Sequence, residues 1–572
     1  MLSHQRDGAG GRVELIEVER EPDGTLRLRG EPLRTYPDTL LALLDAAAGR
    51  APERAFLIER DARDVWHQVS FKTVAERSRR VGGALRALGA TEKRPVMILS
   101  GNGIDHAMVT FGALRAGIPV VPVSAKTGLA ASDGFARLRE IVEAVRPGVV
   151  FARDGAAYAA AVRAVAPDAA FVTATEPPPG TRAFDYARLL AHAPLASAAG
   201  ERIDGETVAK ILFVSGSTGE TKGVVVTHEM IGALLQGVAQ AWPFLDDHPP
   251  TLVDWLPWSH GLGGNLVLGI ALRHVGTLYV DDGDPTPGRF ERTVRLRAEV
   301  PPTLAFDVPL GWTAWARRLR ADDALRRRWL SRLDRACWAG ATLAPATRDA
   351  LRAIGVPLAA AWGSTETSPA VALTTGVEPA YDALGVPLAG VELKLIPSGD
   401  AYEARVRGAQ VLHGYFWRPD LTAAAFDDEG FYRMGDVVRP VDVRAPERGL
   451  AFVSRVDERF KLASGVWVLA GELRAAFLAE CSDVADVVVS GEGRDIVGLL
   501  VWPTVEGRLL DRDVLRVQVA DAMRRLASNT GPAIRPRRAL VVDARRGSDE
   551  RAHAAAHARL HASEPDAEVI VV

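Results

Sequence analysis

A run of small, hydroxylated and glycine residues, Ser215-Gly216-Ser217-Thr218-Gly219-Glu220-Thr221-Lys222-Gly223, has the composition needed to hold a polyphosphate. Its glycines let backbone N–H groups approach an anion closely, and its hydroxyls and single lysine add further donors. The apolar stretch 208–214 precedes it directly, which places the run at the end of a predicted strand. Its spacing differs from that of a Walker A loop. A surface turn rich in serine and glycine is the alternative interpretation.

Lys222 stands out because lysine is scarce in this chain, which has seven lysines among 69 basic residues. The simplest cause of this arginine bias is the nucleotide composition of the coding sequence. A lysine retained against that bias, at the end of a predicted strand, is a strong candidate for an anion contact.

The run 214–223, VSGSTGETKG, resembles the phosphate-loop signature of the acyl-adenylate-forming (AMP-binding) superfamily. This superfamily contains acyl- and aryl-CoA ligases, luciferases and the adenylation domains of peptide synthetases. Thr221 stands where the signature has a proline. Further matches follow in the order that the superfamily has, so the resemblance rests on several motifs rather than on one loop.

The run 362–366, WGSTE, resembles the aromatic-Gly-x-Thr-Glu motif of the superfamily. The resemblance implies that Trp362 and Gly363 border the nucleotide, that Thr365 contacts the α-phosphate, and that Glu366 binds Mg²⁺. A hard cation takes carboxylate and phosphate oxygens as ligands, so the implied roles fit the chemistry. Such a cation would neutralise charge as a carboxylate attacks the α-phosphorus.

The run 339–343, AGATL, resembles the loop beside the adenine, which implies nucleotide contacts for Gly340, Ala341 and Thr342. The run 432–436, YRMGD, resembles the Tyr-x-(Ser/Thr)-Gly-Asp motif, which implies that Asp436 holds the ribose hydroxyls. Met434 stands where that motif has a hydroxyl residue.

The run 454–457, SRVD, resembles Gly-Arg-x-Asp, which implies a ribose contact for Arg455 and a hinge at Asp457. Ser454 takes the place of the glycine, so a stiffer turn is expected there.

Two further segments, 254–265 with DWLPWSH and GGN, and 460–468 with FKLASGVWV, resemble bacterial feruloyl-CoA synthase-like enzymes. The resemblance implies an aryl acid substrate, such as a hydroxycinnamate, and coenzyme A as acceptor. It implies that His260 lies between the acid pocket and the phosphates, and it makes Lys461 a catalytic candidate.

Candidates for the wall of the acid pocket are Asn265, Phe306 and Trp338. For Phe306 and Trp338, packing in the hydrophobic core is the alternative, since large aromatic side chains are mostly buried.

One departure concerns the C-terminal region, where the superfamily carries a lysine that reaches the carboxylate and the α-phosphate. This chain has no lysine after Lys461, and the corresponding region is 545–553. Arg551 is the candidate replacement, although a guanidinium and an ammonium differ in shape and reach.

These motifs need an α/β scaffold, and the hydrophobic pattern predicts one. Short apolar strands alternate with helical segments from about 95 to 175 and again from 208 to 362, which predicts βαβ units around parallel sheets. Shorter strands and turns around 381–441 predict an antiparallel or barrel-like segment. We expect a large N-terminal domain over 1–454, which binds ATP and the acid, and a small, mobile α+β domain over 455–572, after the hinge near Asp457.

Composition narrows the functional classes. Hydrophobic residues make up 48% and charged residues 25%, and the net charge is -3, so neither nucleic acid nor an anionic membrane is an expected partner. Cys337 and Cys481 lie far apart, which argues against a zinc site or a disulfide framework. There is no secretory h-region and no clean run of about 18 apolar residues, so a cytoplasmic location is expected. A monomer and a homodimer both remain open.

Three functional interpretations follow. The first is an aryl-CoA ligase that uses ATP, Mg²⁺ and coenzyme A. The second is an adenylate-forming enzyme with another second substrate, such as an amide synthetase, or a diazotase that activates nitrite for attack by an aryl amine. The third is a non-catalytic nucleotide sensor, against which the intact Lys222, Glu366, Asp436 and Arg455 weigh.

Overall fold

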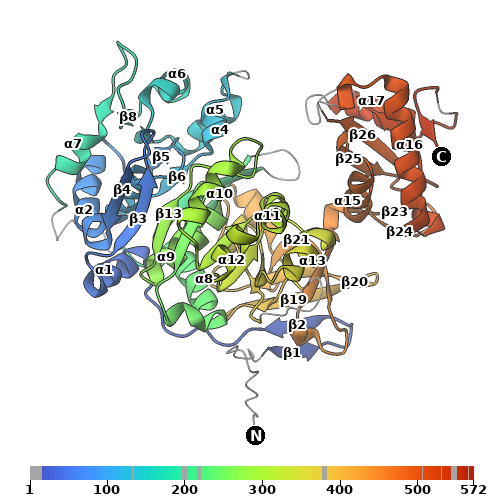
Figure 1. The fold of residues 1–572 in the computed structure, drawn as a ribbon, viewed down its shortest axis with the longest axis horizontal. Helices are drawn as coiled ribbons and strands as arrows, with labels where there is room; N and C mark the ends of the chain where they lie inside the picture. The colour runs from blue at the N-terminus through green and yellow to red at the C-terminus, as the bar shows by residue number, and fades with distance from the viewer. Residues whose placement is uncertain are drawn as a thin grey trace, which may run out of the picture. The chain divides into compact units, whose positions relative to one another are not determined.

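The computed structural model describes residues 16–131, 134–195, 203–215, 221–376, 383–504, 507–529, 531–542, 550–564 and 566–572. The chain forms two compact units (Figure 1). The larger unit comprises residues 1–394, 405–434 and 440–450, and the smaller one comprises 395–404, 435–439 and 451–572.

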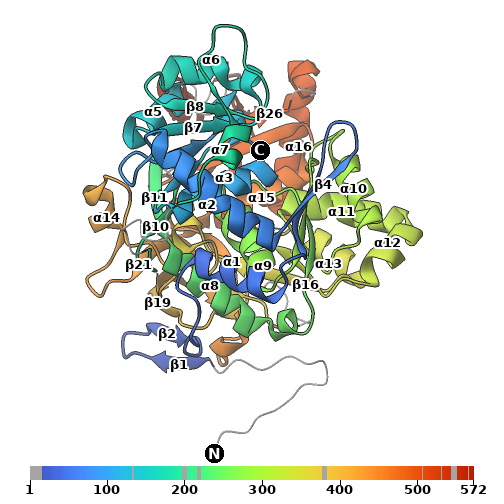
Figure 2. The same ribbon diagram turned by 90° about the vertical axis from the view of Figure 1, so that its left-hand side faces the viewer.

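A seven-stranded sheet in the larger unit carries the predicted βαβ alternation. Its order is β11-β10-β6-β5-β7-β8-β9, with every neighbouring pair parallel except the antiparallel hairpin of β10 and β11. Helices α5 and α6 pack on this sheet, as Figure 2 shows, through a shared apolar core. The strands are β5 (Val96–Ile98), β6 (Val120–Pro122), β7 (Val149–Ala152), β8 (Ala170–Thr173), β9 (Phe184–Asp185), β10 (Val208–Ser215) and β11 (Thr221–Thr227).

A nine-stranded sheet follows in the larger unit, in the order β18-β17-β16-β15-β14-β12-β13-β3-β4. From β16 to β3 every neighbouring pair is parallel, so the carboxyl ends of these strands share one edge. Loops at such an edge are where α/β proteins place their ligands. The strands are β3 (Ala55–Arg60), β4 (Trp66–Ser70), β12 (Thr251–Asp254), β13 (Thr277–Val280), β14 (Leu304–Asp307), β15 (Arg335–Trp338), β16 (Leu358–Trp362), β17 (Ala372–Leu373) and β18 (Val386–Pro387).

The helices of the larger unit connect these strands and cover the sheets. They are α1 (Leu40–Arg50), α2 (Phe71–Ala87), α3 (Ile104–Arg115), α4 (Ala125–Gly128), α5 (Ala136–Val145), α6 (Gly155–Val165), α7 (Tyr186–Ala191), α8 (His228–Ala241), the π-helix η3 (Leu262–Val267), α9 (Leu268–Arg273), α10 (Phe290–Glu299), α11 (Pro309–Ala321), α12 (Asp323–Leu330), α13 (Pro345–Ala353) and α14 (Pro419–Ala425).

Of the short strands predicted around 381–441, all but β18 form a third sheet together with β22 and two strands near the N-terminus. Its order is β1-β2-β19-β20-β21-β22. The strands are β1 (Glu17–Arg20), β2 (Leu26–Arg29), β19 (Glu392–Ser398), β20 (Ala401–Arg407), β21 (Tyr432–Pro440) and β22 (Leu450–Arg455).

The smaller unit has its own α+β core around the sheet β25-β26-β27-β28. Side chains of β26 alternate between the two faces of this sheet, as expected for a strand. Leu499 and Val501 pack in the cluster with α15 and α16, whereas Leu500 and Trp502 pack with α17. The elements are β23 (Arg459–Lys461), β24 (Trp467–Leu469), α15 (Ala470–Glu480), β25 (Val484–Ser490), β26 (Val497–Pro503), α16 (Arg512–Asn529), β27 (Pro536–Val541), α17 (Glu550–Leu560) and β28 (Ile570–Val571).

The α/β fold class predicted from the sequence is confirmed, including the small α+β unit at the C-terminus. Among the helices that the structure describes, none is long and apolar enough to cross a membrane.

Three buried aspartates lie at the carboxyl edge of the nine-stranded sheet. Asp254 and Asp307 end β12 and β14, and Asp281 directly follows β13; each is less than 5% exposed. The guanidinium of Arg297 lies 3.9 Å from a carboxylate oxygen of Asp307 and is itself buried. Burial raises the pKa of Asp307 to about 6 and raises the pKa of Asp254 and of Asp281 as well. The positive charge of Arg297 is therefore shared by three carboxyl groups. This sharing favours a state in which one of the three carboxyl groups stays protonated.

We predict that Asp254→Asn flattens the dependence of stability on pH. Because the folded-state pKa of Asp254 is raised, its contribution to stability is fully present below about pH 3.8 and is lost as the pH rises through the folded-state pKa. The amide resembles the protonated carboxyl group and keeps an oxygen for the N–H of Leu256. Thermal midpoints at pH 5, 6.5 and 8 should fall less steeply for the variant than for the wild type. Equal slopes would show that Asp254 is ionised throughout this range.

Candidate active site

Lys222 is held at the start of β11, directly after the phosphate-loop candidate. Ser215 ends β10 and pairs with Thr221, so the two strands of the hairpin close around the loop. The loop residues Gly216, Ser217, Thr218 and Gly219 lie outside the described residues, as does the side chain of Ser215. The hairpin nevertheless fixes the position of the lysine backbone relative to both ends of the loop.

Glu366 lies on a tight turn that leaves the carboxyl end of β16. Trp362 ends the strand and is buried, and the 3₁₀ turn Thr365–Thr367 follows. A Cβ on Gly363 would lie 2.3 Å from the carbonyl oxygen of Pro369, so glycine is required for the close approach of the two backbones. The N–H of Ser364 donates to Thr367 Oγ1 at 2.8 Å, and this bond helps to hold Thr365 and Glu366 at the sheet edge.

Tyr415 connects the glutamate with the lysine. Its hydroxyl donates to Glu366 Oε1 at 3.0 Å, and Lys222 Nζ lies 5.6 Å from the centre of its ring. The backbone adds two bonds, from the N–H of Leu412 to the carbonyl of Glu366 at 2.7 Å and from the N–H of Phe416 to the carbonyl of Gly223 at 2.8 Å. The segment 412–416 thus ties two candidate motifs together.

The environment keeps the Tyr415 hydroxyl protonated. Burial, together with the nearby Glu366 carboxylate, raises the pKa of Tyr415, while a hydrogen bond with Tyr432 lowers it. A protonated phenol can donate to the carboxylate and hold it in one orientation. Tyr415 was not among the residues singled out from the sequence, because no motif quoted there includes it; the aromatic run YFW at 415–417, between predicted strands, was the available signal.

The adenine-loop candidate leaves the neighbouring strand at the same edge. β15 and β16 are parallel and paired, with Trp338 opposite Ala360, so the loops that follow them lie side by side. Gly340, Ala341 and Thr342 are exposed, and Gly340 has a φ of +85°. An exposed loop next to the Glu366 turn is accessible to a ligand bound along this edge.

The two ribose-binding candidates meet in the smaller unit. Arg455, the last residue of β22, donates from Nη1 to Asp436 Oδ1 at 2.6 Å, and Asp436 is buried. Gly435 has a φ of +70°, and a Cβ there would lie 2.8 Å from Arg455 Nη2. Glycine therefore both permits the backbone conformation and leaves room for the guanidinium. The motifs at 432–436 and 454–457 thus form one charged pair.

The residues around Glu366 suit a Mg²⁺ ion that is bound together with phosphates. Within the described ranges, they do not form a metal site built from protein ligands alone. In the part of the chain that the structure describes, no three His, Cys, Asp or Glu side chains are grouped to hold a metal. Magnesium usually takes one or two carboxylates and completes its coordination with phosphate oxygens and water. Glu366 is half-buried, is oriented by Tyr415 and lies on an edge loop, so the residues present fit this mode of binding.

His260 lies two residues before the start of the π-helix η3, with Gly261 between them. Its backbone carbonyl accepts from the N–H of Gly264 at 2.9 Å, and its own N–H donates to the carbonyl of Pro257. Desolvation and the positive charge of Arg137 lower the pKa of His260, so the neutral imidazole is favoured at pH 7. A neutral imidazole can both donate and accept a hydrogen bond.

The three acid-pocket candidates differ in their surroundings. Asn265 is buried within η3, where its Oδ1 accepts from Lys210 Nζ at 2.9 Å. Phe306 is 1% exposed and packs near Trp242, and Trp338 belongs to the apolar cluster under α11–α13. Both aromatic side chains thus take part in core packing, and a role in an acid pocket stays a prediction.

The two remaining catalytic candidates belong to the C-terminal region. Lys461 ends β23, and its Nζ lies 4.8 Å from the ring centre of Trp467 on the paired strand. Arg551 lies near the start of α17, and its side chain is outside the described part of the chain, together with residues 543–549.

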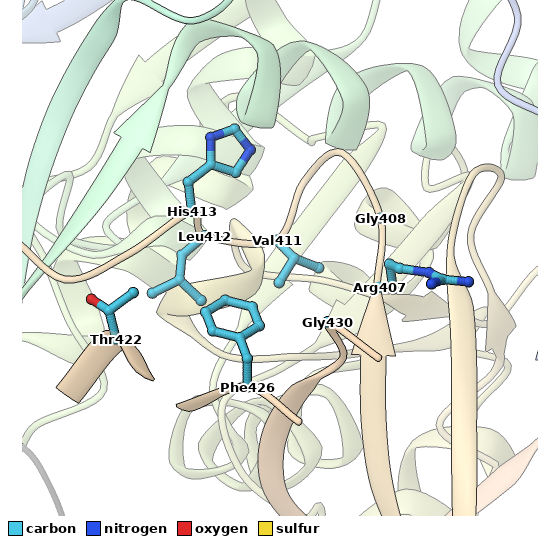
Figure 3. A pocket seen from close by; sticks show the side chains of 8 residues that line it. All are labelled: Arg407, Gly408, Val411, Leu412, His413, Thr422, Phe426 and Gly430. Carbon is cyan, nitrogen blue, oxygen red and sulfur yellow. The ribbon is translucent and has the colours of Figure 1, made fainter. Parts of the chain in front are cut away.

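A cavity of about 380 Å³ opens next to the segment that holds Glu366. In Figure 3 the side chains of Val411, Leu412 and Phe426 converge, whereas Arg407 and His413 point away from them. None of the site residues predicted from the sequence lines this cavity; its lining comprises Arg407, Gly408, Val411, Leu412, His413, Thr422, Phe426 and Gly430.

Comparison with known proteins places the chain in a family. Residues 44–416 match the family described as AMP-binding enzyme. The chain is 26% identical to the 4-hydroxybenzoate–CoA/benzoate–CoA ligase of Rhodopseudomonas palustris, over 81% of this chain and 83% of that protein. It is also 26% identical to the AMB antimetabolite synthetase AmbE of Pseudomonas aeruginosa, over 82% of this chain but 21% of that much longer protein.

The fold is that of a solved relative. The crystal structure of ATP-bound MatB from Rhodopseudomonas palustris superposes with a TM-score of 0.70 at 21% identity, covering 89% of this chain and 95% of that one. The family match over residues 44–416 spans the positions of Lys222, Glu366 and Tyr415. The chain therefore belongs to the AMP-binding enzyme family and is an ATP-dependent, adenylate-forming ligase.

Proposed function

We propose that the enzyme activates an aromatic, hydroxycinnamate-like carboxylic acid as its acyl-AMP and transfers the acyl group to coenzyme A. The observation that carries the proposal is the Glu366 carboxylate, which Tyr415 orients beside the lysine of the phosphate loop. An aryl acid is favoured because the segment 254–265 resembles feruloyl-CoA synthase-like enzymes and because the relative from Rhodopseudomonas palustris is named for aryl acids.

In the first half-reaction, a carboxylate oxygen of the acid attacks the α-phosphorus of ATP, and pyrophosphate leaves. Both reactants are anions, so the protein must hold them together against their repulsion. In the proposal, Lys222 neutralises charge on the phosphates while the hydroxyl of Thr365 contacts the α-phosphate. His260 lies between the acid and the phosphates, where its neutral imidazole adds a hydrogen bond without adding charge.

Glu366 would hold Mg²⁺, which supplies charge neutralisation to the phosphates when it is bound. The loop 340–342 would border the adenine, and the pair of Asp436 and Arg455 would hold the ribose hydroxyls. In that pair the guanidinium of Arg455 fixes the orientation of the Asp436 carboxylate.

In the second half-reaction, the thiolate of coenzyme A attacks the acyl carbonyl carbon, and AMP leaves. We propose that residues 455–572 form the domain that turns about Asp457 between the two half-reactions. Asp457 lies in the short 3₁₀ turn Val456–Glu458 directly after β22, and it is half-exposed. Few residues are needed to absorb such a rotation.

A second substrate other than coenzyme A is the alternative, because the chain has no lysine after Lys461. A diazotase would activate nitrite and leave the acid pocket to an aryl amine, and an amide synthetase would pass the acyl group to an amine. The adenylating residues would be the same in each case.

The test is to identify the product. The purified enzyme receives Mg²⁺-ATP and a panel of cinnamic and benzoic acids, amino-substituted acids included, alone, with coenzyme A, or with nitrite. AMP and pyrophosphate are quantified, and mass spectrometry identifies acyl-CoA or diazo products. We expect acid-dependent AMP formation and an aryl-CoA thioester. AMP formation that requires nitrite or an amine and yields no thioester would overturn the coenzyme A proposal in favour of the alternative.

A second prediction concerns Glu366→Gln, which keeps an oxygen for the Tyr415 hydroxyl and removes the negative charge. We expect AMP formation to fall by about 100-fold or more, because an electrostatic contact in the transition state is lost. Circular dichroism and the thermal midpoint should stay close to those of the wild type. Unchanged turnover would show that the metal ligand lies elsewhere.

Tyr415→Phe is the variant to compare with Glu366→Gln, since it retains the ring near Lys222 and removes only the hydroxyl. Its activity should fall by about tenfold, as expected for the loss of one charge-assisted hydrogen bond. Raising the Mg²⁺ concentration should restore part of that loss, whereas Glu366→Gln should respond little.

A further inference from the structure

Lys210 is a buried lysine in the middle of β10, and the mechanism above does not use it. It is 4% exposed, and its side chain reaches the π-helix η3. Its Nζ donates to the carbonyl of Gly264 at 2.6 Å and to Asn265 Oδ1 at 2.9 Å. Among the described residues, no carboxylate forms an ion pair with this ammonium group.

An unpaired buried amine is costly, and an apolar side chain of similar length would avoid that cost. Burial lowers the pKa of Lys210 to about 7. The titratable groups that face it, His106 and His228, are buried too, and burial lowers the pKa of each to about 4, so they bring no compensating charge. The cavity next to the amine, about 10 Å³, has room for one water molecule at most. A contribution to stability alone therefore does not account for a lysine here.

The two acceptors of Lys210 belong to an unusual turn. η3 is a π-helix, a form that is rare and frequent at functional sites. The N–H of Gly264 donates to the carbonyl of His260 at 2.9 Å, so a group that fixes residue 264 also fixes the turn that carries the histidine. Lys210 donates to the carbonyl of that same residue, Gly264.

Lys210 also decides which way the Asn265 amide faces. With Oδ1 bonded to the ammonium, Nδ2 must point away from it. Nδ2 is buried and has no hydrogen-bond partner among the residues that the structure describes, and it lies 3.8 Å from where a Cβ on Gly261 would be. The donor end of the amide therefore faces the residue that follows His260.

We propose that Lys210 is a positioning residue for the carboxylic acid substrate: it clamps the η3 turn that follows His260 and fixes Asn265 with its amide donor on the His260 side. This inference rests on the proposed function, because it assigns the acid to the His260 side of the site. It makes binding of the acid, rather than of ATP, dependent on a lysine outside the recognised motifs.

The test compares Lys210→Met with Lys394→Met. Methionine keeps the apolar length and removes both hydrogen bonds. Lys394 is the matched control, since it is also nearly buried and bonds Asp427 and Glu429 at a distance from η3. In Lys210→Met the KM for the acid should rise about tenfold, the effect of one charge-assisted hydrogen bond, while the KM for ATP stays within about twofold. Lys394→Met should change neither.

Amide hydrogen exchange supplies a readout that needs no substrate. Peptides within 258–270 should exchange faster in Lys210→Met than in the wild type and in Lys394→Met, with other regions unchanged. If the wild type forms no acyl-AMP, the proposed function fails, but faster exchange in this segment still supports the clamp, and unchanged exchange overturns it.

Two further variants distinguish a specific effect of Lys210→Met from a general effect on folding. Asn265→Leu and the double variant Lys210→Met/Asn265→Leu complete a double-mutant cycle, in which the effects on the acid KM should be clearly less than multiplicative. An unchanged acid KM in Lys210→Met, equal rises in both KM values, or independent effects in the cycle would each overturn the proposal.

Discussion

The hydrogen bond from the Tyr415 hydroxyl to the Glu366 carboxylate, 3.0 Å long, holds together parts of the site that are far apart in the chain. Glu366 extends from the edge of the nine-stranded sheet, and Lys222 belongs to a hairpin of the seven-stranded sheet. Without a bridge, two loops from separate sheets would need to order themselves around a highly charged ligand. With it, the carboxylate and the ammonium are already near each other, and less ordering remains to be done when the nucleotide binds.

The sheet edge sets a second constraint, because several parallel strands end there in polar or aromatic residues. Some of these ends carry the proposed ligand contacts, such as the turn at Glu366, and others are buried. The charge of Arg297 acts on Asp254, Asp281 and Asp307, and burial raises the pKa of each carboxyl group. The polar side chains at this edge therefore form two groups. One group is proposed to contact the ligand, and the other is buried, where ionisation of its carboxyl groups lowers stability as the pH rises.

Patterns that are local in sequence were sufficient to predict the strands, the helices and the motif loops. The alternation from 95 to 175 appears as β5 to β8 with α3, α5 and α6, and the runs at 340 and 363 follow neighbouring strands. Contacts between distant residues were not predictable. Tyr415 contacts Glu366 across 49 positions, and Lys210 contacts Gly264 across 54, so no single stretch of sequence carries either pairing. Phe306 and Trp338 pack in the core, which the sequence also allowed, and their role in an acid pocket stays a prediction.

The central claim is that these residues adenylate an aryl carboxylic acid although the chain carries no lysine after Lys461. The most direct measurement is the exchange of labelled pyrophosphate into ATP, without coenzyme A, nitrite or amine, because it reports reversible formation of an acyl-AMP and nothing later. We expect exchange that requires both Mg²⁺ and an aryl acid and that is lost when the acid is omitted. ATP binding without exchange, for every carboxylic acid tried, would contradict it.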